Sequence, residues 1–294
     1  MRILKSTCMA IVVWLLGCQV IWASDESLKL SLELTDNRFL TGESVHLFIY
    51  LSNTGTSDAR YEQFHLGGAL LNVHLKNSDG KEILYQGIWA EYDRGGAQQF
   101  VLKPGEEAQQ VVGLDRDFPT YLNTKLPYGS PFLSMLVPGE YHVQAEYRWG
   151  TTLLRSNELS FQVVDPPDSE LAAYNALKEY FTTVFWRKTS PSHSLLLHSF
   201  IVRYASSHYR PLALFFLADV SGKTGNQKRA QELFENLIEE YPAASLAVAS
   251  LRAMAGDSSQ KAALYEKILR TNRNARLSRT AKYLLQKLAM SKTK

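Results

Sequence analysis

The stretch SVHLFIYLSN, residues 44–53, decides how the first half of the chain folds, because its apolar residues recur at every second position. Val45, Leu47, Ile49 and Leu51 fall on one side of an extended chain. A period of two is typical of a half-buried antiparallel strand, since successive side chains point to opposite faces. The stretch therefore predicts a strand with one face in a core.

Four further stretches show the same alternation. They are SLKLSLELT (27–35), ALLNVHLKN (69–77), EYHVQAEY (140–147) and ELSFQVV (158–164). Turn sequences such as SDG, KPGEE and VPGE separate the strands, and no helical period lies between them. Roughly seven to nine short strands of this kind predict an immunoglobulin-like β-sandwich over residues 25–165.

The last strands of this region also resemble a known class of domain. VLKPGEE (101–107), VPGEYHVQAEY (137–147) and RSNELSFQVV (155–164) are similar to the corresponding strands of bacterial immunoglobulin-like adhesion and inhibitor domains. The resemblance implies a sandwich whose loops can bind a partner, including the cleft of a proteinase.

Two aromatic loops lie between the predicted strands, at residues 87–100 and 116–132. Their candidate binding residues are Trp89, Tyr92, Tyr121 and Tyr128. Rings on loops at the end of a sandwich can stack on a sugar ring or on a peptide. The alternative is that these rings close the open end of the core.

The pattern changes at DPPD, residues 165–168, where two prolines exclude a helix and Asp168 can cap the next one. In the stretch from 169 to 187, apolar residues recur at steps of three and four, which predicts an amphipathic helix. We expect residues 168–290 to be all-helical. The predicted fold class is therefore a multidomain chain, all-β and then all-α.

The helical half contains an internal repeat. The stretch NLIEEYPAASLAVASLRAMA (236–255) aligns with residues 199–218 and 267–286. Ala230, Phe234 and Pro242 are spaced as in the second helix of a tetratricopeptide repeat, so residues 211–244 resemble one such unit, with weaker copies on either side. The resemblance implies an α-solenoid whose concave surface binds proteins or peptides. An unrelated helical bundle is the alternative.

The N-terminus has the composition of a secretory signal, which we place at residues 1–23. Arg2 and Lys5 precede the short apolar run CMAIVVWLLG, which is too short to span a membrane. Cleavage can follow Ala23, or LLGC can act as a lipobox with Cys18 lipidated. Both cysteines lie in this segment, so a disulfide is excluded from the mature chain. We expect a periplasmic or secreted protein, or alternatively a membrane-anchored lipoprotein.

The formal net charge of +3 hides a division between the halves. Residues 25–167 hold 11 Lys/Arg and 19 Asp/Glu, whereas residues 168–294 hold 19 and 10. A basic stripe near the C-terminus consists of Lys267, Arg270, Arg273, Arg276, Arg279 and Lys282. It can face anionic lipid, an acidic partner, the acidic half of the chain, or only solvent. Nucleic acid is disfavoured because the chain is predicted to be exported and no aromatic residues interleave the charges.

The sequence carries no established catalytic motif: H-E-x-x-H, G-x-S-x-G, a phosphate-binding glycine loop and C-x-x-C are all absent. We therefore expect no enzyme activity, no cofactor and no metal. The predicted function is a non-catalytic binding or scaffold protein of the bacterial envelope with a protein or peptide partner. The alternatives are a proteinase inhibitor, or an enzyme or carbohydrate-binding protein that uses the aromatic loops.

Overall fold

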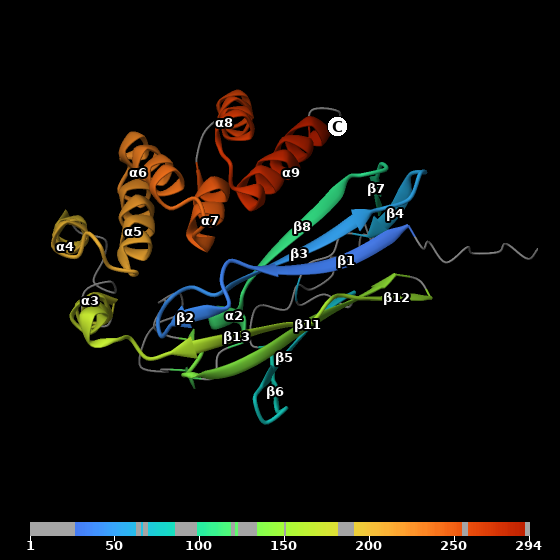
Figure 1. Ribbon diagram of the computed structural model, residues 1–294. Helices are drawn as coiled ribbons and strands as arrows, with labels where there is room; N and C mark the ends of the chain where they lie inside the picture. Colours follow the sequence, from blue (N-terminus) through green and yellow to red (C-terminus); the bar gives the residue numbers. More distant parts are fainter. Residues whose placement is uncertain are drawn as a thin grey trace, which may run out of the picture.

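The computed structural model describes residues 27–62, 66, 70–85, 99–118, 121–122, 134–149, 151–181, 191–254 and 258–291. It has three layers: a six-stranded sheet, a three-stranded sheet packed on it, and helices on the other side of the three-stranded sheet (Figure 1). The strands occupy the first half of the chain and most of the helices the second.

The three-stranded sheet consists of β1 (Leu28–Leu34), β3 (His46–Asn53) and β8 (Glu107–Gly113), all antiparallel, with β3 in the centre. The six-stranded sheet has the order β2 (Arg38–Leu40), β13 (Leu159–Val164), β11 (Gly139–Trp149), β5 (Leu71–Asn77) and β6 (Glu82–Ile83), with β12 (Thr152–Arg155) also paired to β11. Strand β2 joins β13 in parallel. Two short pairs complete the strands: β4 (Ala59–Glu62) with β7 (Gln99–Leu102), and β9 (Tyr121–Leu122) with β10 (Ser134–Met135).

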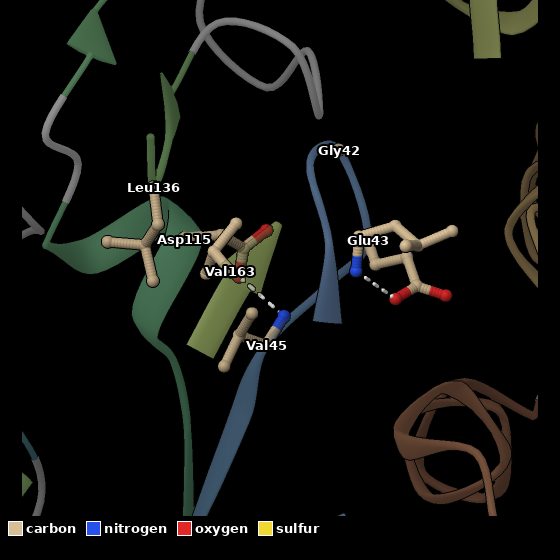
Figure 2. Close-up of a pocket in the computed structure, with 7 residues that line it drawn as sticks. Gly42, Glu43, Val45, Asp115, Leu136 and Val163 are labelled. Atoms are coloured by element: carbon tan, nitrogen blue, oxygen red, sulfur yellow. Dashed lines mark hydrogen bonds between the residues drawn. The ribbon is translucent and has the colours of Figure 1, made fainter. Parts of the chain in front are cut away.

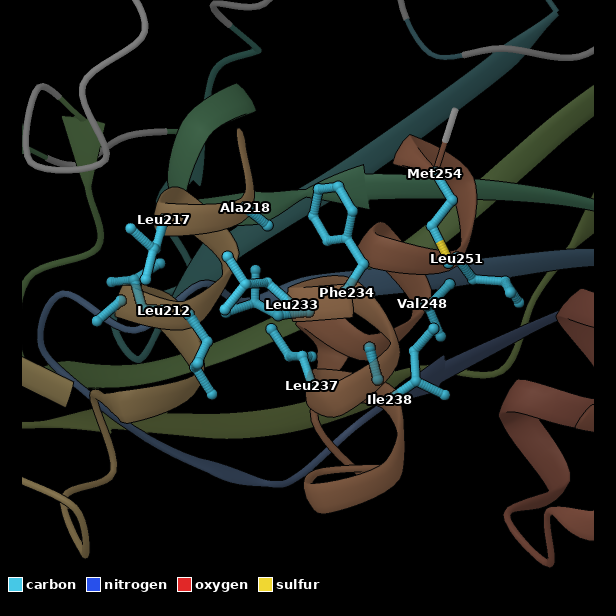
Figure 3. Packing of buried hydrophobic residues seen from close by; sticks show 14 of the residues in the cluster. Leu212, Leu217, Ala218, Leu233, Phe234, Leu237, Ile238, Val248, Leu251 and Met254 are labelled. Carbon is cyan, nitrogen blue, oxygen red and sulfur yellow. The ribbon is translucent and has the colours of Figure 1, made fainter. Parts of the chain in front are cut away.

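The helices are α2 (Leu114–Asp117), α3 (Asp168–Glu179), α4 (Pro191–Arg203), α5 (Arg210–Lys223), α6 (Gln227–Glu240), α7 (Ser245–Ala253), α8 (Ser258–Thr271) and α9 (Ala275–Ser291). Helices α5 and α6 form an antiparallel hairpin. Gly225 takes the positive φ of 88° at the end of α5, and the Asn226 side chain accepts a hydrogen bond from the Arg229 backbone NH at 3.2 Å to cap α6. Phe234 of α6 is buried between Ala218 of α5 and Leu251 of α7 (Figure 3).

Strand β3 is buried on both of its faces. Leu47, Ile49 and Leu51 point into the core between the two sheets. Phe48 and Tyr50 point the other way and belong to the core of the helices, where they are 0% and 1% exposed. The helices thus cover the outer face of the three-stranded sheet, and the two halves of the chain share a layer.

The turn between β2 and β3 also joins the sheets to the helices. The Tyr209 hydroxyl donates to the Thr41 carbonyl at 2.8 Å, just before α5 begins. The Ser245 hydroxyl, at the start of α7, donates to the Ser44 carbonyl at 3.2 Å. Each bond spans more than 160 positions of sequence.

The predicted fold class, an immunoglobulin-like sandwich followed by a tetratricopeptide-like α-solenoid, is wrong. The chain is a mixed α/β structure with several sheets, and its helices pack on a sheet instead of following it as a separate array. The physical reason is the second buried face of β3: Phe48 and Tyr50 need a cover, and the helices supply it. The resemblance of residues 211–244 to a tetratricopeptide unit stays a prediction.

Candidate binding groove

The outer face of the three-stranded sheet is a grid of nine side chains, three from each strand. The strand register places them in rows: Lys29, Ser52 and Glu107; Ser31, Tyr50 and Gln109; Glu33, Phe48 and Val111. The first row is polar, and the aromatic residues lie in the other two. One face thus offers a polar end and an apolar end.

Helix α9 lies over the aromatic end of this grid. The Arg276 guanidinium is 5.2 Å from the centre of the Phe48 ring, and that of Arg279 is 3.7 Å from the centre of the Tyr50 ring. Arg276 Nη2 also donates to the Leu34 carbonyl at 2.7 Å, at the end of β1. Cations over aromatic faces are attracted to the π electrons, so both arginines hold α9 against the sheet.

Arg279 is also the centre of an ion-pair cluster. Its Nε and Nη2 donate to the two carboxylate oxygens of Glu107 at 2.9 and 2.7 Å, and its Nη1 donates to Glu33 at 2.6 Å. Burial raises the pKa of Glu107, but the hydrogen bonds from Arg279 and Ser52 outweigh it, so the pKa lies below its ordinary value. The same bonds raise the pKa of Arg279. Both groups are therefore charged at neutral pH.

A groove opens on one side of the Glu107–Arg279 pair, where α9 no longer covers the sheet. It has a volume of about 410 Å³ and is lined by Lys29, Ser31, Ser52, Asn53, Thr54, Gly55, Gly105, Glu107 and Arg279. Within the described part of the chain, the Lys29 and Ser31 side chains have no hydrogen-bond partner. We call this space the polar groove. Its volume is within the range of about 300–1,000 Å³ that is usual for ligand pockets.

A smaller cavity of about 80 Å³ lies on the other side of the same ion pair. Its lining consists of Tyr50, Glu107, Gln109, Arg279, Lys282, Tyr283 and Gln286. The Gln109 amide donates to the Thr280 hydroxyl at 3.0 Å and accepts from Arg252 Nη2 at 3.2 Å, which connects β8 to α9 and α7. Burial raises the pKa of Tyr50, so its hydroxyl stays neutral. We call this space the small cavity.

The pocket drawn in Figure 2 is different in kind. It lies between the turn that carries Gly42 and Glu43 and the helix that carries Asp115 (Figure 2). Its volume is about 10 Å³, which is at most the space of one water molecule. The Asp115 carboxylate accepts from the Val45 backbone NH at 3.2 Å. This pocket is therefore part of the packing.

The structure divides the predicted basic stripe between α8, α9 and the connection that carries Arg273, and its members have two kinds of surroundings. Lys267, Arg270, Arg273 and Lys282 are exposed, and Lys267 pairs with Glu239 at 3.3 Å. Arg276 and Arg279 are partly buried against the sheet. The stripe is thus not one surface: two of its six cations contact the acidic half of the chain.

Several other predicted residues lie outside the described part of the chain. These are Cys18 and the rest of the predicted signal, and Trp89, Tyr92 and Tyr128 of the aromatic loops. Tyr121 lies in β9, opposite Met135 of β10, and its side chain is not described. The hypothesis that these rings bind a ligand therefore stays a prediction.

Sequence reasoning missed Gln109 and Arg252. Gln109 occupies an alternating position of a strand, where a polar side chain reads as solvent-exposed, and it is 4% exposed. Arg252 lies on a helix with no charged pattern around it. The sequence did contain one sign that the second face of this strand is buried: Phe48 and Tyr50 are large aromatic residues on the side of residues 44–53 that was expected to be polar.

The described residues contain no group of three or more His, Cys, Asp or Glu side chains placed to hold a metal ion. Among the helices that the structure describes, none combines the length and the apolar character needed to cross a membrane. The groove thus offers charges, hydroxyls and amides for binding.

No protein-family model matches the chain, and no curated protein does so either. Among solved structures, a β-glucosidase from Erythrobacter marinus is 17% identical, with 47% of this chain and 16% of the enzyme covered and a TM-score of 0.25. The sporulation control protein Spo0M of Bacillus subtilis is 13% identical, with 52% and 55% covered and a TM-score of 0.26. The alkylpurine DNA glycosylase AlkC of Pseudomonas fluorescens is 15% identical, with 47% and 30% covered and a TM-score of 0.25. The chain spans about half or less of each of these proteins, and such low scores support no argument about its fold or function.

Proposed function

We propose that this chain is an exported, non-catalytic binding protein of the bacterial cell envelope, and that it holds a protein or peptide segment in the polar groove. Export rests on the signal-like composition of residues 1–23. The observation that carries the binding function is the polar groove itself, an open space of about 410 Å³ on a sheet face that is covered elsewhere.

The lining of the polar groove supports this proposal. Lys29 offers a cation, and Ser31 a hydroxyl, to an incoming chain. The floor is a β-sheet held by the Arg279 cluster, so the groove keeps its shape before a ligand arrives. A rigid polar floor with unpaired groups favours recognition of a polar chain segment.

Site-specific photo-crosslinking tests the proposal. A photoreactive amino acid at Ser31 lies in the polar groove, whereas the same amino acid at Gln162 lies on the exposed face of the six-stranded sheet. We expect irradiation in bacterial envelope extract to join a discrete polypeptide to the Ser31 variant only. Mass spectrometry of the joined band then identifies the partner.

Excess unlabelled protein should remove the crosslinked band by competition. No band at Ser31, or the same bands from Ser31 and Gln162, would overturn the proposal. The variant Lys29→Glu reverses a charge that has no partner among the described residues of the groove, and it should reduce the yield of the band. Lys76→Glu on the opposite sheet should not.

A further inference from the structure

In the part of the chain that the structure describes, Arg252 is a cation without an anionic partner. It lies on α7, and its side chain is exposed to solvent. Its hydrogen bond goes to the neutral amide oxygen of Gln109 at 3.2 Å, and no described carboxylate pairs with it. Burial nevertheless lowers the pKa of Arg252, and the phenols of Tyr283, Tyr50 and Tyr265 only partly offset this.

The small cavity lies next to Arg252. Gln109, which accepts the hydrogen bond from Arg252, lines the cavity, and so do Tyr50 and Tyr283, whose phenols also affect the pKa of Arg252. Lys282 lines the cavity from α9, and among described residues it makes no ion pair within 4.0 Å. Lys282 thus lines the space, and Arg252 is bonded to its wall through Gln109.

The charges around the small cavity do not balance. Among the described residues that line it, Arg279 and Lys282 are cationic and Glu107 is anionic, which leaves one positive charge. The Arg279 guanidinium is already engaged by the carboxylates of Glu33 and Glu107. The cations that remain for a ligand are Lys282 in the lining and Arg252 beside it.

We infer that the small cavity is a carboxylate-binding subsite of the groove, in which Arg252 and Lys282 hold a carboxylate of the bound segment and Gln109 orients the Arg252 guanidinium. This inference rests on the proposed function, because the carboxylate belongs to the polypeptide in the polar groove. Glu107 and Arg279 line both spaces, so the two are neighbours on the same face of the sheet. Guanidinium and ammonium groups form charge-assisted hydrogen bonds with carboxylates, which are stronger than bonds between neutral groups.

A carboxylate suits this place better than a phosphate does. One surplus positive charge matches a monoanion, and the nearby Glu33 and Glu107 would repel a second negative charge. None of the described lining residues lies at a helix N-terminus, where a cluster of backbone NH groups favours phosphate.

Protection from phenylglyoxal tests the inference on the full mature chain. This reagent attacks an uncharged guanidine, so the lowered pKa of Arg252 should make it more reactive than exposed Arg270. The probes are acetyl-Gly-Glu-Gly-amide, its Gln counterpart, and inorganic phosphate at equal ionic strength. Peptide mapping by mass spectrometry gives the modification rate of each arginine.

We expect the Glu peptide to slow modification of Arg252 about threefold when it fills roughly two thirds of the sites, by mass action. The Gln peptide and phosphate should slow it much less, and Arg270 should be unaffected. Lys282→Gln should weaken the protection, whereas Lys267→Gln, a cation of α8 outside the cavity lining, should leave it unchanged.

Equal protection by the Glu and Gln peptides would overturn the inference, as would better protection by phosphate or no effect of Lys282→Gln. These results leave the crosslink at Ser31 unaffected, so a partner that crosslinks there without a carboxylate effect removes only this inference. Protection of Arg252 without any crosslink at Ser31 removes the proposed polypeptide ligand.

Discussion

The two faces of strand β3 are buried by different means. On the inner face, Leu47, Ile49 and Leu51 pack among aliphatic and aromatic side chains of both sheets. On the outer face, Phe48 and Tyr50 lie under arginines of α9, beside an ion-pair cluster and a cavity. The inner face gives the sheets their stability, and the outer face attaches the helices through contacts that also shape the groove. Because charged side chains attach α9 to this outer face, space for a ligand remains beside them.

The largest expected effect comes from removing the helices. A fragment of residues 25–165 would expose Phe48, Tyr50 and Val111 on one face, and soluble monomers rarely expose a continuous apolar patch of that kind. We expect the fragment to aggregate or to lose its cooperative thermal transition, as followed by size-exclusion chromatography and circular dichroism. A monomeric fragment that melts like the full chain would show that the outer face needs no cover.

A substitution on each face compares the two within the intact chain. Phe48→Ala should lower the free energy of unfolding by about 3–5 kcal/mol, and Ile49→Ala by about 2–5 kcal/mol, since both empty fully buried sites. Chemical denaturation measures both values. If Phe48→Ala changes stability by less than about 1 kcal/mol while Ile49→Ala has its full effect, the helices do not form a core with β3.

Arg279→Met tests the polar attachment. The change leaves Glu107 without its charged donor and leaves Glu33 with Arg276 at 3.8 Å, and it should cost roughly 1–3 kcal/mol. Arg270→Met is the matched control, because that exposed arginine makes no ion pair in the described part of the chain and should stay within about 0.5 kcal/mol. If both substitutions change the free energy of unfolding equally, the ion-pair cluster of Arg279 contributes nothing to stability.

The smallest expected effect is the pH dependence of the difference in unfolding free energy between the native chain and Arg279→Met. The pKa of Glu107 lies below the ordinary value of 4.5 in the folded chain, so the folded state binds fewer protons there than the unfolded state. Its contribution is complete above about pH 4.5 and is lost as the pH falls through the lowered pKa. The stability gap between the native chain and Arg279→Met should therefore narrow on acidification.

Glu43 acts in the opposite direction, since burial raises its pKa. Its effect is common to both proteins and cancels in the comparison. A gap that stays constant from neutral pH to below 4.5 would show that Arg279 does not lower the pKa of Glu107.

The local pattern of the sequence predicts the strands but not their partners. The alternation in residues 27–35 and 44–53 coincides with β1 and β3, because the period of two is a property of each strand alone. The second buried face of β3 escaped this reasoning. It depends on helices that begin more than 110 positions later, and the aromatic side chains of Phe48 and Tyr50 were the only local sign of it.

The groove was beyond prediction for a similar reason. Glu33 and Glu107 are separated from Arg279 by 246 and 172 positions of sequence. The spacing of the cations does not predict which of them contact a sheet. The regular spacing of the stripe led us to treat six residues as one surface. The helix boundaries at Thr271 and Ala275 divide it, and among its described members Arg276 and Arg279 are the ones that make ion pairs with the strands.

The position of α9 also sets an order of assembly. A ribosome releases the strands before α9, so Phe48 and Tyr50 remain without their arginine contacts until α9 has been made. Closing a loop of more than 200 residues costs entropy before these contacts return any stability. A chain truncated before Ala275 would therefore expose apolar surface on the sheet. We expect such truncated products to depend on chaperones and to be removed by proteases.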